Sequence, residues 1–235
     1  MLKYTKEYSK GGQYMSDFNK ERKDIETIDI PLEDLLGMAV DGHGSLPSVT
    51  DYVDFSEFKD RVLIINGDVG DYLMTLIRQI MFYNSEDKRK NIAKENRKPI
   101  KVCIYSYGGD VNMGKAVMAA IEASETPVWT INMGTAYSMG CMILLSGHRR
   151  FAMKHSEALI HEGSASLSGS AAQVADAHKA YQRKLEWCKT YTLEHTTISP
   201  ALYKKKLKDD WYISDKEQVE YGIVEKLIDN IEELY

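Results

Sequence analysis

The sequence has 235 residues, which suits one α/β domain with extensions and allows a core to be buried without the help of metals or disulfides. Hydrophobic residues make up 43% and charged residues 28%, and the net charge of -5 offers no general attraction to nucleic acid or to an acidic membrane. No apolar run approaches the roughly 18 residues of a membrane span, and the N-terminus lacks the continuous apolar segment of a secretory signal. We therefore expect a cytoplasmic protein with no membrane or nucleic-acid partner.

Three scattered cysteines bear on redox and metal chemistry. Cys103 lies in a strand-like apolar run, Cys141 in a helix-like apolar run and Cys188 in an amphipathic stretch. An odd number at such positions argues against a disulfide framework, and no CxxC or Cys/His cluster predicts a zinc site. A catalytic role for Cys141 is conceivable, but a buried structural thiol is the better interpretation.

The first part of the chain, residues 1–58, is predicted to be a partly mobile N-terminal extension to a domain that spans residues 59–235. Residues 1–24 are polar and are expected to be mobile or ordered only by a partner. The run IDIPLEDLLGMAV predicts a short ordered segment, and DGHGSLPSVTDY predicts a loop because Gly and Pro interrupt it. We assign no chemistry to the isolated His43 in that loop.

After this extension the pattern alternates between strands and helices. The run RVLIING is rich in β-branched residues and stops at Gly67, as a buried strand would. Residues 68–85 carry apolar side chains at helical spacing, with Asp71 as the candidate N-terminal cap. The charged stretch of residues 86–98 is expected to be a solvated loop or an exposed helical extension, and an anionic partner for its basic side chains is the less favoured hypothesis.

The alternation continues to the C-terminus. The run KVCIYS predicts a strand that leads through two glycines into a helix. The run PVWTINMG predicts a further strand, which is followed by a predicted helix at AYSMGCMILLSG. Two short strands are predicted at RRFAM and EALIH. Residues 171–196 have long helical periodicity, and Ser199 followed by Pro200 is a helix start signal. The last segment predicts a short helix ended by Gly222, a short strand and a tail. Strands that alternate with helices indicate an α/β fold with a parallel sheet and right-handed crossovers.

A serine on a sharp turn is the first candidate for chemistry. Ser138 lies in the run GTAYSMG, between a predicted strand and a predicted helix. The small residues around it let the backbone bend tightly and let a substrate carbonyl approach. The free N–H groups at the start of the helix are suited to stabilising an oxyanion. Because serine is also a common helix cap and a weak nucleophile without a base, the motif alone does not establish catalysis.

Two further side chains are candidates for activating this serine. His161 ends the run EALIH, and a histidine at the end of a strand can lie at the carboxyl edge of the sheet, where α/β proteins bind ligands. Asp210 in KDDWYIS is suited to holding such an imidazole in the correct tautomer, with Asp209 as its local competitor. A single histidine at such a position is more often a core or rim residue than a catalytic base, and a single aspartate like Asp210 is more often a helix cap at the surface.

Gly108 and Gly109 follow a strand and expose a backbone N–H that no side chain shields. The pair resembles a phosphate loop only superficially, because neither GxxxxGK[ST] nor GxGxxG is present in it, and nucleotide binding is not expected. The two glycines better suit an oxyanion donor and an edge for an extended peptide.

Together these features resemble the proteolytic subunit of the Clp proteases (ClpP), a serine peptidase family within the wider Clp/crotonase fold. The resemblance covers residues from about 61 to 230 and depends on IYSYGGDV, MGTAYSMG, ALIHEG and DDWYISDKEQVEYGIVEKL, in that order. It implies an α/β fold of repeated β-β-α units with a protruding handle helix near residues 171–196.

The resemblance also implies roles for individual residues. Ser138 matches the nucleophile of the family, His161 its base and Asp210 its acid. The two backbone N–H groups of the oxyanion hole map to Gly109 and Met139. The implied reaction is acyl transfer at a peptide bond, without a metal or an organic cofactor.

Members of the family stack as two rings of seven that enclose the active sites, so the resemblance implies a homo-oligomer that takes peptides or unfolded proteins. An AAA+ unfoldase or phage capsid proteins are further candidate partners. The chain departs from the family at Tyr107, where proline is usual, and at Glu162-Gly163, where Gln-Pro is common. Residues 84–99 form a longer connection than usual, and the first 55 residues do not match the axial pore loops.

Two alternatives stay open on the residues alone. The first is a catalytically inactive ClpP-like scaffold or peptide-binding subunit. The second, disfavoured by a complete Ser/His/Asp set, is an acyl-CoA enzyme of the crotonase type, which also uses paired backbone N–H groups. The peptidase requires Ser138, His161 and Asp210 to converge within hydrogen-bond distance, which the inactive scaffold does not.

Overall fold

The structure, a computed structural model, describes residues 49–234. The predictions for residues 1–48, including the mobile segment, the ordered segment and His43, lie outside the described residues. The loop predicted by DGHGSLPSVTDY is wrong at its end, because helix α2 (Val49–Lys59) begins within it. From residue 57 onward the described chain belongs to one compact unit, which contains every feature discussed below.

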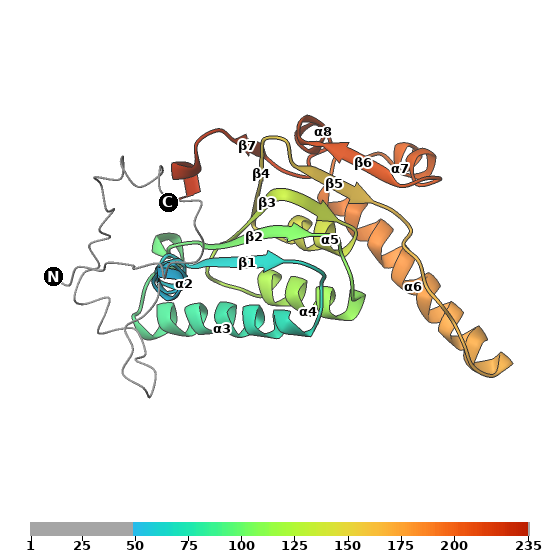
Figure 1. Cartoon of the computed structure of the whole chain (residues 1–235), viewed down its shortest axis with the longest axis horizontal. Coiled ribbons are helices and arrows are strands. Elements are labelled where there is room, and N and C mark those ends of the chain that lie inside the picture. The colour runs from blue at the N-terminus through green and yellow to red at the C-terminus, as the bar shows by residue number, and fades with distance from the viewer. Residues whose placement is uncertain (1–48, 235) are drawn as a thin grey trace, which may run out of the picture. The chain divides into compact units, whose positions relative to one another are not determined.

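Strands and helices alternate along the described chain (Figure 1). The strands are β1 (Val62–Asn66), β2 (Ile100–Ser106), β3 (Val128–Tyr137), β4 (Arg149–Met153), β5 (Glu157–Ile160), β6 (Trp211–Ser214) and β7 (Lys226–Ile228). The helices after α2 are α3 (Met74–Arg89), α4 (Val111–Glu122), α5 (Met139–Leu145), α6 (Ala171–His195), α7 (Pro200–Lys206) and α8 (Asp215–Glu220). Short 3₁₀ turns lie at Asp71–Leu73, Lys94–Asn96 and Ile231–Leu234. The α/β fold predicted from the sequence is confirmed.

The strands form one sheet with a mixed edge. Strands β1, β2, β3, β4 and β7 lie side by side in that order and run parallel. Strand β5 pairs in parallel with β3 and antiparallel with β6. Strand β6 is absent from the sequence-based expectations, because the run WYIS has only four residues and alternates between buried and exposed positions. The prediction of a parallel sheet is therefore wrong at this edge, where β6 runs antiparallel to β5.

The sheet divides at β3, because the two halves of this strand pair with different neighbours. The first half pairs with β4, and the last three residues pair with β5. Asn132 is buried at the branch, where its Nδ2 donates to the Glu157 carbonyl and to Gln218 Oε1, each at 3.0 Å. Its Oδ1 accepts from the Gly134 N–H at 3.1 Å. Since this buried amide is satisfied on both sides, it fixes the branch and sets the carboxyl end of β3 beside the end of β5.

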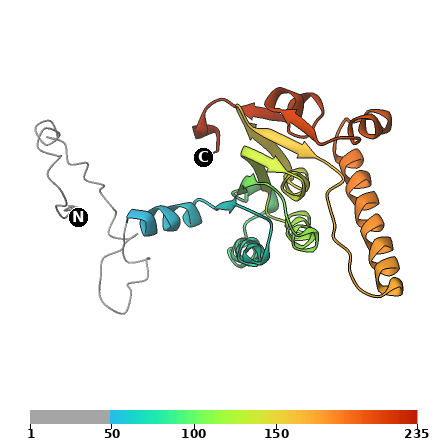
Figure 2. The same cartoon turned by 45° about the vertical axis from the view of Figure 1, so that its right-hand side comes forward.

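The two faces of the sheet are covered differently. Helices α3, α4 and α5 lie on one face (Figures 1 and 2). The largest fully buried apolar residues of the core on that side are Ile65, Leu73, Ile80, Ile100, Ile104, Met118, Ile121, Ile143, Leu144 and Leu145. A smaller cluster includes Cys103, Ile131, Phe151, Ile228 and Leu234. Leu234 belongs to the C-terminal 3₁₀ turn, so this turn covers part of the second face.

The long helix predicted near residues 171–196 is α6. Ser170 opens it with a capping box, in which Ser170 Oγ accepts from the Gln173 N–H at 3.4 Å and the Gln173 side chain accepts from the Ser170 N–H at 2.9 Å. Of its residues, only Tyr191 and Thr192 near the C-terminal end are buried. The N-terminal part of α6 projects away from the sheet (Figure 2), whereas Trp187, Cys188 and Leu193 pack against the core.

Two predicted helix starts have different outcomes. Ser199 caps α7 by accepting from the Leu202 N–H at 3.2 Å, and Pro200 is the first helical residue, as predicted. Asp71 does not cap α3, because it begins a 3₁₀ turn that precedes the helix. The apolar spacing misled the prediction at this point, since a 3₁₀ turn buries Leu73 as well as an α-helical turn would.

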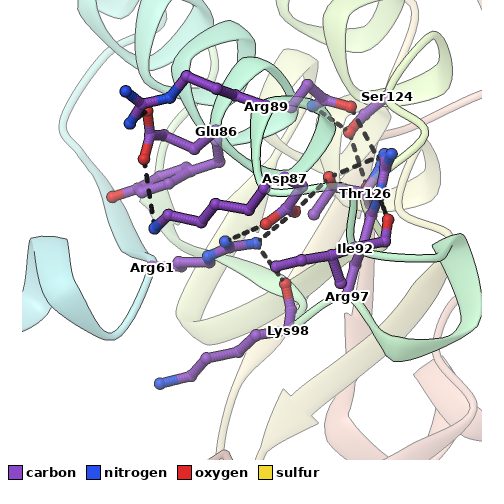
Figure 3. Close-up of polar contacts among 12 residues, drawn as sticks. Arg61, Glu86, Asp87, Arg89, Ile92, Arg97, Lys98, Ser124 and Thr126 are labelled. Carbon is purple, nitrogen blue, oxygen red and sulfur yellow. Dashed lines mark hydrogen bonds and ion pairs between the residues drawn. The ribbon is translucent and has the colours of Figure 1, made fainter.

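A buried polar cluster joins the start of β1 to α3 (Figure 3). Asp87 is fully buried and accepts hydrogen bonds from the two terminal nitrogens of Arg61, at 2.7 and 2.5 Å, and from Thr126 Oγ1 at 2.8 Å. Arg61 also donates to the Lys98 carbonyl at 2.8 Å. The expectation of an exposed charged stretch is wrong for Asp87, because α3 continues to Arg89 and turns the aspartate inward.

Candidate active site

Ser138 occupies the predicted sharp turn between β3 and α5. Its backbone has φ 52° and ψ -117°, a conformation that residues other than glycine rarely adopt. The Ser138 N–H donates to the Leu159 carbonyl at 2.9 Å, which holds the turn against β5. A Cβ on Gly108 would lie 2.7 Å from the Ser138 Cβ, so this close approach requires glycine. A strained residue held this firmly is typical of functional sites.

His161 directly follows β5, the strand that pairs with the carboxyl end of β3. Its Nε2 lies 2.7 Å from Ser138 Oγ, which is hydrogen-bond distance. The next residue is anchored from α6, because the Tyr181 hydroxyl donates to the Glu162 carbonyl at 3.1 Å. The structure therefore brings together a hydroxyl and an imidazole nitrogen, the pairing that an activated serine requires.

Asp210 directly precedes β6, which runs antiparallel to β5. Ile160 pairs with Trp211 at the end of this ladder. His161, which follows Ile160, therefore faces Asp210, which precedes Trp211. The Nδ1 atom of His161 and the Oδ1 atom of Asp210 are 3.4 Å apart. The Asp210 side chain is 56% exposed, so the contact is solvated. Among residues 49–234, Asp209 makes no such contact with the imidazole.

The backbone N–H groups predicted for an oxyanion belong to Gly109 and Met139. Gly109 has φ 143°, and a Cβ there would lie 2.5 Å from the Val69 carbonyl oxygen, so only glycine fits. Val69 fixes this segment by donating to the Gly108 carbonyl at 2.7 Å and accepting from the Asp110 N–H at 2.8 Å. Met139 is the first residue of α5. In the described part of the chain, neither predicted N–H donates to another protein group.

A cavity of about 370 Å³ lies beside Ser138 and His161. Its walls are mostly apolar and come largely from α5, α6 and the region of α7; they include Met139, Cys141, Met142, Leu185, Cys188, Thr192, Tyr203 and Leu207. The sequence-based prediction missed the wall residues of α6 and α7, because each is an ordinary member of a helical apolar pattern. A cavity of this size and lining can hold an apolar side chain next to the reacting carbonyl.

A thiol also lies at the site. Cys141 lines the cavity but is buried, and burial raises the pKa of its thiol to about 12. Because the thiolate is the nucleophilic form, this cysteine is inert at neutral pH, in agreement with a structural role. Within residues 49–234, no group of three His, Cys, Asp or Glu side chains could hold a metal ion. Over the same range, no helix combines the length and apolar character needed to cross a bilayer.

Comparison with known protein families adds an independent result. A family model described as Clp protease matches residues 49–231. The match covers well over half of the 235-residue chain. It includes the whole sheet and all three side chains that meet at the carboxyl ends of β3 and β5.

Proposed function

The chain belongs to the Clp protease family, and from that premise we propose that it is a serine endopeptidase with Ser138 as nucleophile, His161 as base and Asp210 as acid. The observation that carries the proposal is the 2.7 Å distance between His161 Nε2 and Ser138 Oγ. An imidazole at this distance can take the hydroxyl proton as the oxygen attacks. The contact of Asp210 with the other ring nitrogen favours the tautomer that leaves Nε2 free to accept that proton.

The proposed reaction has two halves. In the first, Ser138 Oγ attacks the peptide carbonyl carbon while His161 takes the hydroxyl proton, the C–N bond then breaks, and His161 gives the proton to the leaving amine. An ester between Ser138 and the acyl part of the substrate remains. In the second half, water attacks this ester, and His161 takes the proton of the water and returns it to Ser138 Oγ. The products are a carboxylic acid and an amine, and the enzyme is regenerated.

The negative charge of each tetrahedral intermediate would be stabilised by the N–H groups of Gly109 and Met139. Both stand on segments that cannot relax easily, since Gly109 is clamped by Val69 and Met139 begins a buried helix. Fixed donors are effective in this role because they need no reorganisation as charge develops. No metal or organic cofactor takes part in this mechanism.

We extend the proposal to a ring-shaped homo-oligomer, the assembly that the family resemblance implies. The support within this chain is α6, which is 25 residues long and has only Tyr191 and Thr192 buried. The alanines at 171, 172 and 175 are exposed near its start. A projecting helix with small exposed side chains allows close packing against the same helix of another copy. Peptides or unfolded proteins are the proposed substrates, delivered by an AAA+ unfoldase or cut during phage capsid maturation.

Labelling with a fluorophosphonate probe, followed by intact mass measurement, tests the catalytic assignment. We expect one adduct per wild-type chain and none on Ser138→Ala or His161→Ala, because the probe reacts only with a base-activated serine. Ser164→Ala is the matched control, since Ser164 lines the same cavity and should not affect labelling.

Two results would contradict the assignment. An adduct that persists on Ser138→Ala would place the reactive group elsewhere. The absence of an adduct on assembled wild-type protein would favour the inactive scaffold.

A further inference from the structure

Four tyrosines form a continuous row of rings near Ser138. The ring centroids of Tyr105 and Tyr107 are 6.0 Å apart, those of Tyr107 and Tyr137 are 5.7 Å apart, and those of Tyr137 and Tyr212 are 5.7 Å apart. The interplanar angles are 79°, 77° and 81°, so all three pairs are edge-to-face, a preferred geometry of aromatic pairs. We call these four residues the tyrosine row.

The tyrosine row lies on the face of the sheet opposite α3, α4 and α5. Ile104 and Ala136, which precede Tyr105 and Tyr137, belong to the core under those helices. Successive residues of a strand point to opposite faces, so the tyrosines point away from the helices. The same alternation applies to Tyr212, whose two neighbours in β6 are buried. The row is therefore on the face that the helices leave open.

Much of the tyrosine row is accessible to solvent. Tyr105 is 42% exposed, Tyr107 58% and Tyr212 52%. Single exposed aromatic residues need no explanation, but contiguous exposed rings are typical of binding surfaces. Tyrosine suits such a surface because its rigid ring offers a large contact area at a low cost in conformational entropy.

Tyr107 joins the tyrosine row to the candidate active site. It lines the cavity together with Ser138, and its ring also contacts those of Tyr105 and Tyr137. Tyr137 immediately precedes Ser138 in the chain. Leu159, which also lines the cavity, pairs with Tyr137 in β3 and with Tyr212 in β6. The cavity and the row therefore adjoin, so a peptide with a carbonyl at Ser138 can place one side chain in the cavity and another against the row.

Polar contacts help to hold three of the four rings of the row, those of Tyr105, Tyr107 and Tyr137. The Tyr137 hydroxyl donates to the Glu157 carboxylate, and this hydrogen bond raises the pKa of Tyr137 to about 12. The hydroxyl oxygens of Tyr105 and Tyr107 are 3.3 Å apart. A surface that is ordered before binding loses less conformational freedom when a ligand arrives.

We propose that the tyrosine row is a specificity-determining subsite that binds an aromatic side chain of the peptide substrate, at a position other than that of the residue in the cavity. The inference rests on the proposed peptidase function and deepens it. An aromatic ring is the favoured occupant because it extends an edge-to-face series that the protein has already arranged. The exposed ring of Tyr212 ends the row and is the position from which the series would continue.

Paired quenched fluorogenic peptides test the proposal. In each pair, a single position on one side of the cleaved bond carries either Phe or Ser, and the ratio of the two kcat/KM values is measured. We expect the wild type to prefer Phe by about three- to tenfold at one such position, the range that one aromatic contact supplies. Tyr212→Ala should reduce this ratio to less than about twofold, whereas Tyr212→Phe should keep it, because the ring is retained. The ratio is the readout because a loss of folding or of general activity lowers both rates together.

Tyr72→Ala is the matched control, because Tyr72 is 48% exposed and its ring lies outside the tyrosine row. This variant should keep the wild-type ratio. A ratio that Tyr212→Ala leaves unchanged overturns the proposal. A change of oligomeric state in Tyr212→Ala with the ratio intact also overturns it, because the row would then pack against a second copy of the chain.

Binding measurements separate a failure of this proposal from a failure of the proposed function. The same peptides are titrated into Ser138→Ala and into Ser138→Ala/Tyr212→Ala, with fluorescence anisotropy as the signal. Selective weakening of the Phe peptide in the double variant supports the subsite even if the wild type cleaves nothing. Equal binding of both peptides to both variants overturns the subsite even if the wild type is an active peptidase.

Discussion

Two aspartates of this molecule, Asp87 and Asp210, each face a basic partner in opposite surroundings. Asp87 is fully buried, lies 2.5 Å from Arg61 and also accepts from Thr126 (Figure 3). Burial alone would raise the pKa of Asp87, but the hydrogen bonds from Arg61 and Thr126 outweigh it and hold that pKa below its ordinary value. Asp210 is 56% exposed and makes a single contact with His161 at 3.4 Å.

The difference follows from what each partner does. Arg61 is always positively charged, so the buried carboxylate of Asp87 always has an opposite charge beside it. In the proposed mechanism, His161 gains and loses a proton in every catalytic cycle, so its carboxylate partner must tolerate both states. A solvated contact allows this and contributes little to folding. We therefore expect Asp87 to matter for stability and Asp210 for rate.

The largest effect is expected for His161→Ala. Its kcat on a peptide should fall by about four orders of magnitude, because Ser138 loses its base. Steady-state cleavage of a fluorogenic peptide measures this fall. His178→Ala, which changes an exposed histidine of α6, is the control and should keep wild-type activity. A fall of less than about tenfold in His161→Ala would rule out the role of base.

Asp87→Ala should produce the next largest effect, on stability. The free energy of unfolding should decrease by about 3–5 kcal/mol, because the change leaves the Arg61 guanidinium without its carboxylate. Urea unfolding of Asp210→Ala provides the matched comparison and should differ from wild type by no more than about 0.5 kcal/mol. Similar decreases in the free energy of unfolding of the two variants would contradict the view that Asp87, unlike Asp210, matters for stability.

Asp210→Asn tests whether Asp210 contributes to the rate of catalysis. We expect kcat to fall by about a hundredfold to a thousandfold, less than for His161→Ala, because the contact orients the imidazole but is long and solvated. Asp209→Asn is the control and should change kcat little, since Asp209 does not contact the imidazole. If Asp209→Asn causes the larger loss, the acid has been assigned to the wrong residue.

The smallest effect concerns the pH dependence of stability. Because the folded state lowers the pKa of Asp87 below its ordinary 3.8, the ion pair stabilises the fold fully above that value and its contribution is lost as pH falls through the lowered pKa. The difference in unfolding free energy between wild type and Asp87→Asn should be constant above about pH 5 and shrink below about pH 4. Urea unfolding across this range measures the difference, and a difference that grows on acidification would contradict a lowered pKa.

The main elements of the site can be predicted from the sequence because each candidate residue adjoins a recognisable strand or helix. Ser138 stands between an apolar strand and an apolar helix, and His161 ends a run of apolar residues. Local patterns therefore locate both at the edge of the sheet. The position of Asp210 depends on β6, whose four residues give too short a pattern to predict, so the residues alone left Asp209 as a competitor and only the family resemblance favoured Asp210.

The buried ion pair and the tyrosine row are not predictable in this way. Asp87 lies in a highly charged stretch, and its burial depends on Arg61, which is 26 residues away in the chain. The tyrosines at 105, 137 and 212 come from three strands, and β6 is joined to β3 only through β5, which pairs with the carboxyl end of β3 beyond β4. Both features arise from tertiary packing, which local periodicity does not report.

The branch in the sheet has a geometric consequence for the alignment of the site. His161 and Asp210 extend from the paired strands β5 and β6, whereas Ser138 extends from β3, and only three residue pairs join β3 to β5. His161 and Asp210 are thus placed together by one strand pair, and the distance from Nε2 to Oγ depends on how that pair is held against β3. The Asn132 hydrogen bonds at the branch and the hydrogen bond from the Ser138 N–H to the Leu159 carbonyl hold it there, so the alignment of the three side chains is maintained by contacts outside them.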